Sequence, residues 1–123
     1  DSTVLTGTTG MADRDACELM LPTGERLSGI NVNHVLPGTA VAASVRPERI
    51  EAHFAPPENT ANFIKAAVTD VIYFGDHLRL RCAITGQAPA TVKLPLARGE
   101  QPVAGQPVWL LLPLQPWEIA IPA

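Results

Sequence analysis

Four carboxylates in two stretches of the sequence could together hold a positively charged solute. Glu48 and Glu51 lie in the first stretch, and Asp70 and Asp76 lie in the second. Carboxylates form charge-assisted hydrogen bonds with ammonium groups, so Asp70, Asp76 and Glu48 are candidate ligands of a small cation. Asp76 also follows a glycine, where an aspartate can bond the backbone of its own turn, and Asp70 could lie on a solvated strand face. The sequence leaves both interpretations open and favours the structural one.

The motifs of the common catalytic and metal sites are missing from the sequence. A phosphate-binding loop needs a lysine directly after a glycine, whereas Lys65 follows isoleucine and Lys93 follows valine. The histidines His34, His53 and His77 are far apart, and no H-x-x-H, H-E-x-x-H or C-x-x-C spacing occurs, so no zinc site is expected. A Gly-x-Ser-x-Gly elbow is also missing. We therefore expect no catalysis, no metal and no cofactor in this chain.

The composition is that of one globular domain with few aromatic residues in its core. Of 123 residues, 46% are hydrophobic but only 5% are aromatic, so the core must consist of Val, Leu, Ile and Ala. The net charge of -3 argues against a nucleic-acid groove, which needs clustered Lys and Arg. The longest apolar run ends at Pro113 and is far shorter than the ~20 residues of a membrane span. Cys17 and Cys82 are expected to be buried, inert thiols in a reducing compartment.

Prolines and glycines divide the sequence into short apolar or alternating segments, which is typical of an all-β fold. We predict strands over residues 4–8, 16–21, 26–32, 39–46, 49–54, 62–74, 77–85, 90–95, 107–114 and 118–121. Short helical turns are predicted over 47–50, where Pro47 suits a first turn, and over 57–63. Gly75 and Asp76 form the turn of a hairpin in which Val68 and Asp70 are expected on the same strand face.

A weak internal repeat indicates two related halves. Residues 17–24 resemble residues 80–86, which places Cys17 and Cys82 at matching positions, and a Gly-led apolar strand follows each segment. Small barrels are a common way to remove the edges of short antiparallel strands. We therefore predict an all-β, small OB-type antiparallel β-barrel with one or two short helical turns. Its N-terminal half would be residues 1–55, its connector 56–65 and its C-terminal half 66–123.

Three segments, in order, resemble the transport-associated OB (TOBE) domain at the C-terminus of ABC importer ATP-binding subunits. Residues 42–50 are similar to its a-x-R-P-E-x-I segment, and residues 67–78 are similar to its G-x-V-x-x-V-x-Y-L-G-D hairpin. Residues 105–119 resemble its closing strand pair and are nearest the polyamine-importer branch. The resemblance implies structural or interface roles for Arg46, Pro47, Glu48, Tyr73, Gly75, Asp76 and Trp117.

The resemblance implies a regulatory or solute-recognition domain without catalysis, in an importer of polyamines or similar small solutes. ATP and Mg²⁺ would belong to a separate ATPase domain. The implied partners are that ATPase domain, a second copy of the subunit, the membrane subunits of the transporter and a small solute. The implied location is the cytoplasmic face of the plasma membrane, through the complex. Neither nucleic-acid binding nor direct membrane insertion is expected.

Two residues of the resembling segments have more specific expectations. Arg46 is expected to form an ion pair with Glu48 that fixes the end of a strand, or to face a partner domain. Trp117 is a candidate interface anchor, because tryptophan is common at binding hot spots. An alternative function is a free-standing barrel that binds a small molecule or oxyanion. In that case the candidate ligands are the hydroxyls of Thr6, Thr8 and Thr9.

Overall fold

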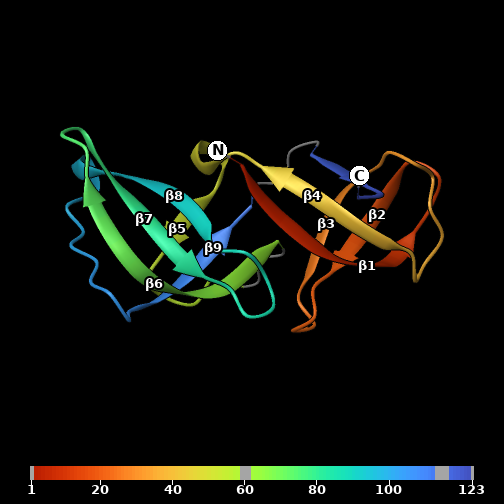
Figure 1. Ribbon diagram of the computed structural model, residues 1–123, viewed down its shortest axis with the longest axis horizontal. Coiled ribbons are helices and arrows are strands. Elements are labelled where there is room, and N and C mark those ends of the chain that lie inside the picture. Colours follow the sequence, from red (N-terminus) through yellow and green to blue (C-terminus); the bar gives the residue numbers. More distant parts are fainter. Residues whose placement is uncertain (1, 59–61, 113–116, 123) are drawn as a thin grey trace.

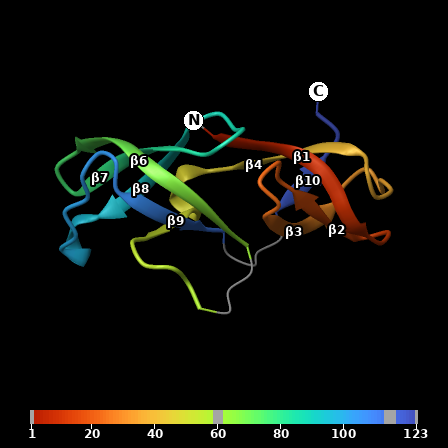
Figure 2. The same ribbon diagram turned by 90° about the horizontal axis from the view of Figure 1, so that it is seen from below.

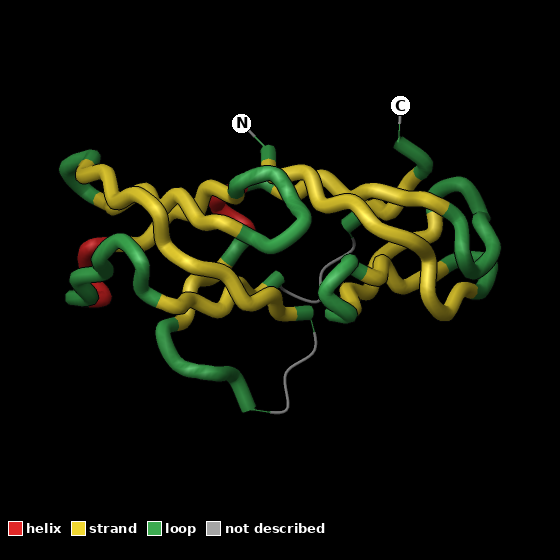
Figure 3. Tube along the Cα trace, turned by 60° about the horizontal axis from the view of Figure 1, so that its bottom comes forward, coloured by secondary structure: helices red, strands yellow, loops and turns green. Residues whose placement is uncertain are grey.

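Two β-structures lie side by side along the long axis of the molecule (Figure 1). The computed structural model describes residues 2–58, 62–112 and 117–122. The strands are β1 (Thr3–Ala12), β2 (Ala16–Met20), β3 (Arg26–Asn31), β4 (Ala40–Val45), β5 (Glu51–His53), β6 (Phe63–Tyr73), β7 (His77–Ala83), β8 (Ala90–Pro95), β9 (Pro107–Leu111) and β10 (Glu118–Ala120). The all-β prediction is confirmed, and Figure 3 shows how completely strands and loops dominate the chain. In the described part of the chain no helix is long and apolar enough to cross a membrane.

The first structure is a closed barrel with the strand order β1-β2-β3-β10-β4. β4 pairs with β1 from Thr3↔Val45 to Thr8↔Ala40, which closes the ring. β10 comes from the far end of the chain and fills the space between β3 and β4 (Figure 2). Its pairing with β3 is parallel, whereas we expected antiparallel strands throughout. A parallel neighbour needs a long connection, and the whole second sheet provides it.

The second structure is a five-stranded sheet with the order β5-β9-β6-β7-β8. The sheets divide the chain differently from the expected halves, 1–55 and 66–123. β5 (Glu51–His53) belongs to the second sheet and β10 (Glu118–Ala120) belongs to the first barrel. Each end of the chain is therefore required to complete the first barrel.

The β6–β7 hairpin is confirmed, but the expected face pattern of β6 is wrong. A β-bulge interrupts the pairing, which passes from Val68↔Cys82 to Asp70↔Arg81. The extra residue, Thr69, moves the following side chains to the opposite face. Val68 is therefore buried while Asp70 is exposed, although simple alternation would place them on one face.

Both structures are filled by aliphatic side chains, as the composition predicts. The largest fully buried side chains of the described residues are Leu5, Leu19, Leu27, Ile64, Leu80, Leu94, Leu110, Leu112, Ile119, Val41, Val68 and Val92. The turn predicted over 47–50 is confirmed as the 3-10 turn η1 (Pro47–Arg49). The turn predicted over 57–63 includes residues 59–61, which lie outside the described residues. A second 3-10 turn, η2 (Leu96–Arg98), follows β8 instead.

Side-chain hydrogen bonds connect the barrel to the second sheet. The Gln87 side chain donates to the Thr6 carbonyl at 2.8 Å and accepts from the Thr6 N–H at 2.9 Å. Asn62, buried before β6, accepts from the Ser28 N–H at 2.9 Å. The Glu25 carboxylate accepts from the N–H of a β6 residue at 2.7 Å. These bonds fix the two structures against each other at several separate points.

Candidate functional site

The three acidic residues proposed as cation ligands are not brought together. Asp70 lies in β6 opposite Arg81, whereas Asp76 lies in the hairpin turn after β6 has ended at Tyr73. Glu48 lies in η1, between the two sheets in the chain. None of the three lines the clefts described below. The described residues also contain no cluster of three His, Cys, Asp or Glu side chains that could hold a metal ion.

Asp76 has the structural role that its turn sequence favours. Gly75 has a φ of 84°, a conformation that glycine adopts at low cost. The Asp76 carboxylate bonds the His77 ring at 2.7 Å, and this bond is the main reason that the Asp76 pKa lies below its usual value. The Phe74 ring stacks on His77, while Tyr73 is two-thirds exposed. The Tyr-Phe-Gly-Asp segment therefore forms an ordered hairpin tip without a cleft among the described residues.

Two of the three hydroxyls proposed for the alternative function, those of Thr6 and Thr9, make structural contacts. The Thr9 hydroxyl is buried and donates to the Thr39 carbonyl at 3.0 Å. Thr6 is held by Gln87, and Thr8 pairs on both sides within the barrel. None of these threonines lines a cleft of the described chain.

The cysteines are buried, as predicted. Burial raises the pKa of the Cys82 thiol to about 11. Burial, assisted by the nearby carboxylate of Asp13, raises the pKa of the Cys17 thiol. Both side chains therefore carry protonated, unreactive thiols at neutral pH.

A cleft of about 490 Å³ lies where the chain leaves the first barrel. Its walls come from β4 and the turn η1, from β10 with its flanking residues, and from Val4 of β1. The charged or hydroxyl-bearing side chains of this wall are Ser44, Arg46, Arg49 and Glu118. Binding sites for small molecules usually have volumes of about 300–1,000 Å³. The size of the cleft suits a small solute.

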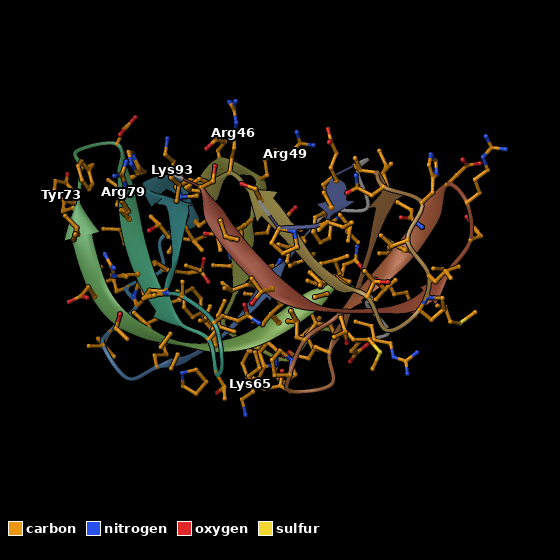
Figure 4. All side chains as sticks on the ribbon, turned by 45° about the vertical axis from the view of Figure 1, so that its right-hand side comes forward. Arg46, Arg49, Lys65, Tyr73, Arg79 and Lys93 are labelled. Carbon is orange, nitrogen blue, oxygen red and sulfur yellow. The ribbon has the colours of Figure 1, made fainter. Side chains whose placement is uncertain are left out.

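The turn η1 brings Arg46 and Arg49 to the same side of the cleft (Figure 4). Pro47 is buried and begins the turn, and the Arg49 N–H donates to the Arg46 carbonyl at 2.9 Å. Arg46 itself is extended and caps the turn, so this backbone hydrogen bond is what brings the two residues close together. Figure 4 also shows Lys65 on the opposite side of the molecule. The two arginines are thus neighbours because of the local turn.

The guanidinium of Arg46 has no hydrogen bond or ion pair with any residue that the structure describes, so the expected pair with Glu48 does not form. Among the described residues that line the cleft, the carboxylate that accompanies the two arginines is that of Glu118. Arginine offers parallel N–H donors that match carboxylate, phosphate and other oxyanions. The cleft therefore has a net positive charge and donors suited to an oxyanion.

Trp117 borders this cleft at the start of β10, and its backbone is held tightly. Its carbonyl accepts from the Ile30 N–H at 3.0 Å. A Cβ atom at Gly29 would lie only 2.6 Å from the same carbonyl, so only glycine allows this approach. The indole Nε1 is shielded from solvent and has no hydrogen-bond partner. An unsatisfied buried donor costs about 1–3 kcal/mol.

Two residues of the cleft, Arg49 and Ser44, were not among the predicted site residues. Both lie within the segment 42–50 that carries the family resemblance. The spacing of Arg46 and Arg49 across a predicted turn was a usable signal, because three residues complete one 3-10 turn. The contribution of β10 carried no such signal in the sequence.

Comparison with known proteins agrees with the resemblance in the sequence. A family model for the TOBE domain matches residues 43–115, which is more than half of the chain. The chain belongs to the TOBE family. TOBE domains are non-catalytic. The matched residues run from the second half of β4 through β9, and hence include both arginines of the cleft.

The TOBE domain also resembles a solved structure over nearly the full length of both chains. The crystal structure of the cytoplasmic molybdate-binding protein ModG, with molybdate bound, has a TM-score of 0.75 to this chain. The match covers 97% of this chain and 95% of that chain, at 14% sequence identity. This likeness shows that the fold is shared over the whole chain. No sequence among the curated proteins matches this TOBE domain.

Proposed function

We propose that this TOBE domain recognises a small oxyanion in the cleft between β4, η1 and β10. The observation that carries the proposal is the pair of arginines on one wall, where the Arg46 guanidinium has no partner among the described residues. Val4, Val45 and Ile121 give the cleft an apolar part of its wall. Electrostatic attraction is stronger in such a site than in bulk water.

The charged side chains of the cleft favour binding of an anion over binding of a polyamine. The carboxylates predicted to bind a cation are distributed over β6, the hairpin turn and η1. A polyamine in the cleft would meet two guanidiniums and only one carboxylate, that of Glu118. ModG, which shares the fold, is a molybdate-binding protein. It supports the idea that this architecture can hold an oxyanion, although no residue can be transferred at 14% identity.

Thermal unfolding and calorimetry with a ligand panel test the proposal. The panel is molybdate, inorganic phosphate, citrate and spermidine. An anion present at 100 times its Kd should stabilise the fold by about 2.7 kcal/mol. Arg46→Gln should abolish this stabilisation. Arg81→Gln, which removes an exposed charge on β7 outside the cleft, should retain it. The proposal fails if no anion binds, or if spermidine alone stabilises the protein.

A second proposal concerns the protein to which the domain belongs. The segments around Arg46-Pro47-Glu48 and Tyr73-Phe74-Gly75-Asp76 favour a regulatory domain of an ABC importer ATP-binding subunit. In that setting its partners would be the ATPase domain, which holds ATP and Mg²⁺, and a second copy of the subunit. The complex would lie at the inner face of the plasma membrane. The solute that the domain senses would then bias the nucleotide-driven closure of the subunit dimer.

The size of the native gene product decides between the two settings. An immunoblot of the source cells with an antibody against this chain should show a product far heavier than 13.1 kDa. A product near 13.1 kDa would contradict the transporter proposal and support a free-standing oxyanion-binding barrel.

A further inference from the structure

The indole of Trp117 is an unused donor at the edge of the proposed anion cleft. Its Nε1 has no hydrogen-bond partner among the described residues and no contact with solvent, although the residue lines the cleft. An indole N–H only donates, so a positively charged group cannot satisfy it. The chemistry of the missing partner is therefore that of an acceptor, which an oxyanion provides.

The backbone of Trp117 cannot move readily to find another partner. The Ile30 N–H holds its carbonyl, and Gly29 packs directly against the same oxygen. The next residues are committed to β10, where Ile119 pairs with β3 and β4 and is fully buried. The freedom that remains is rotation of the side chain about its own bonds. Such a rotation changes the direction of the N–H and also changes the packing of the indole against the hydrophobic core.

We propose that Trp117 is a specificity-determining residue, whose indole N–H donates to an oxygen of the oxyanion bound by Arg46 and Arg49. This inference rests on the proposed function. The side chain rotates to reach the ligand, because its N–H is shielded from solvent in the structure described here. The arginines supply charge and the indole supplies a directed neutral donor. The ligand must then offer oxygen acceptors on two sides, as phosphate, molybdate and a carboxylate group do.

The position of Trp117 also links the ligand to the closure of the first barrel. Arg46 and Arg49 lie after β4, whereas Trp117 directly precedes β10. β4 and β10 pair with each other through Ile119↔Ala43. An oxyanion that bonds both walls therefore connects segments more than 60 residues apart in the sequence.

Tryptophan fluorescence can report this contact, because the described residues contain one other indole, that of Trp109, which lies outside the cleft. In the Trp109→Phe variant the emission comes from Trp117 alone. Titration with inorganic phosphate, molybdate or citrate should change that emission saturably, with the Kd found by calorimetry. Trp117→Phe should raise the Kd about 10-fold, which is the usual effect of losing one hydrogen bond to a charged group. Trp109→Phe should leave the Kd unchanged.

The variants separate a failure of this inference from a failure of the proposed function. If Arg46→Gln abolishes binding while Trp117→Phe binds normally and the emission of Trp117 stays constant, the anion site stands and the indole contact is refuted. If no panel anion binds to the unaltered protein, both proposals fail. Trp117→Phe could weaken binding by loosening β10, so its free energy of unfolding is measured alongside. The contact is supported if Trp117→Phe binds more weakly with an unchanged free energy of unfolding, and if the emission of Trp109→Phe depends on the ligand.

Discussion

Gly7 tests whether the first barrel closes as tightly as the structure indicates. It lies on β1 beside β2, and a Cβ atom there would be 2.0 Å from the carbonyl oxygen of Met20. An ordinary contact begins near 3.4 Å, so Gly7→Ala requires the two strands to separate by about 1.4 Å. The obstacle is backbone, which cannot rotate away. Gly10 offers a matched control on the same strand, because its Cβ would meet the flexible Met20 side chain at 3.0 Å.

The expected cost follows from the contacts that must yield. Overpacking costs about 1–3 kcal/mol, and the adjacent β1–β2 hydrogen bonds, worth about 1 kcal/mol each, are stretched. Gly7→Ala should therefore destabilise the protein by about 2–4 kcal/mol. In Gly10→Ala the side chain of Met20 moves aside. Alanine also lowers the conformational entropy of the unfolded chain, which stabilises the folded protein by about 0.4–1 kcal/mol. The free energy of unfolding of Gly10→Ala should therefore change by no more than about 1 kcal/mol.

Urea unfolding followed by circular dichroism measures both variants. For a domain of this size each kcal/mol corresponds to about 4 °C in Tm, so Gly7→Ala should melt about 8–16 °C below the unaltered protein. Its m-value should be unchanged if the barrel remains intact. Equal stability of Gly7→Ala and Gly10→Ala would refute the close approach of β1 and β2.

Three further predictions concern the connections and the core. Gln87→Ala should lower the free energy of unfolding by about 1–2 kcal/mol in chemical denaturation, because it removes two hydrogen bonds to the Thr6 backbone. Burial raises the pKa of Cys82 from 9.0 to about 11, so the unfolded chain loses the thiol proton first and stability should fall as pH rises from about 9 to about 11. A constant stability over that range would contradict the burial. Ile119→Ala should cost about 2–5 kcal/mol, whereas Val103→Ala, at a 63% exposed position, should change stability by less than about 0.5 kcal/mol.

Local patterns in the sequence predicted the hairpin and most strands of this fold. Alternation in β7 buries Leu80 and Cys82, as expected, and the Gly75 turn joins β6 to β7. The face pattern of β6 failed because Thr69 forms a bulge, and a bulge leaves no mark in simple alternation. The placement of β10 failed for a different reason. A short terminal strand pairs according to tertiary packing, which sequence periodicity does not encode.

The candidate site shows the same limit on sequence-based prediction. Arg46 was found because it belongs to a recognisable motif, and Pro47 indicated the turn that follows it. The acidic residues had the right chemistry for a cation, but β6 and η1 hold them far apart. Trp117 remains a candidate interface anchor, and the structure in addition puts it on the wall of a cleft. Which charges share a cleft depends on which strands become neighbours, and composition alone does not give that information.

The position of the cleft makes binding a test of the whole fold. One wall belongs to β4 and η1, which lead into the second sheet, and the other belongs to β10, which returns from it. The cleft therefore exists only when β10 has joined the first barrel. An anion that binds this state but not the unfolded chain must stabilise the closed barrel, by an amount that grows with the ratio of its concentration to its Kd. Local opening of β10 would remove Trp117 and Glu118 from the arginines. Slower hydrogen exchange in β10 on binding is consequently the expected sign of this coupling.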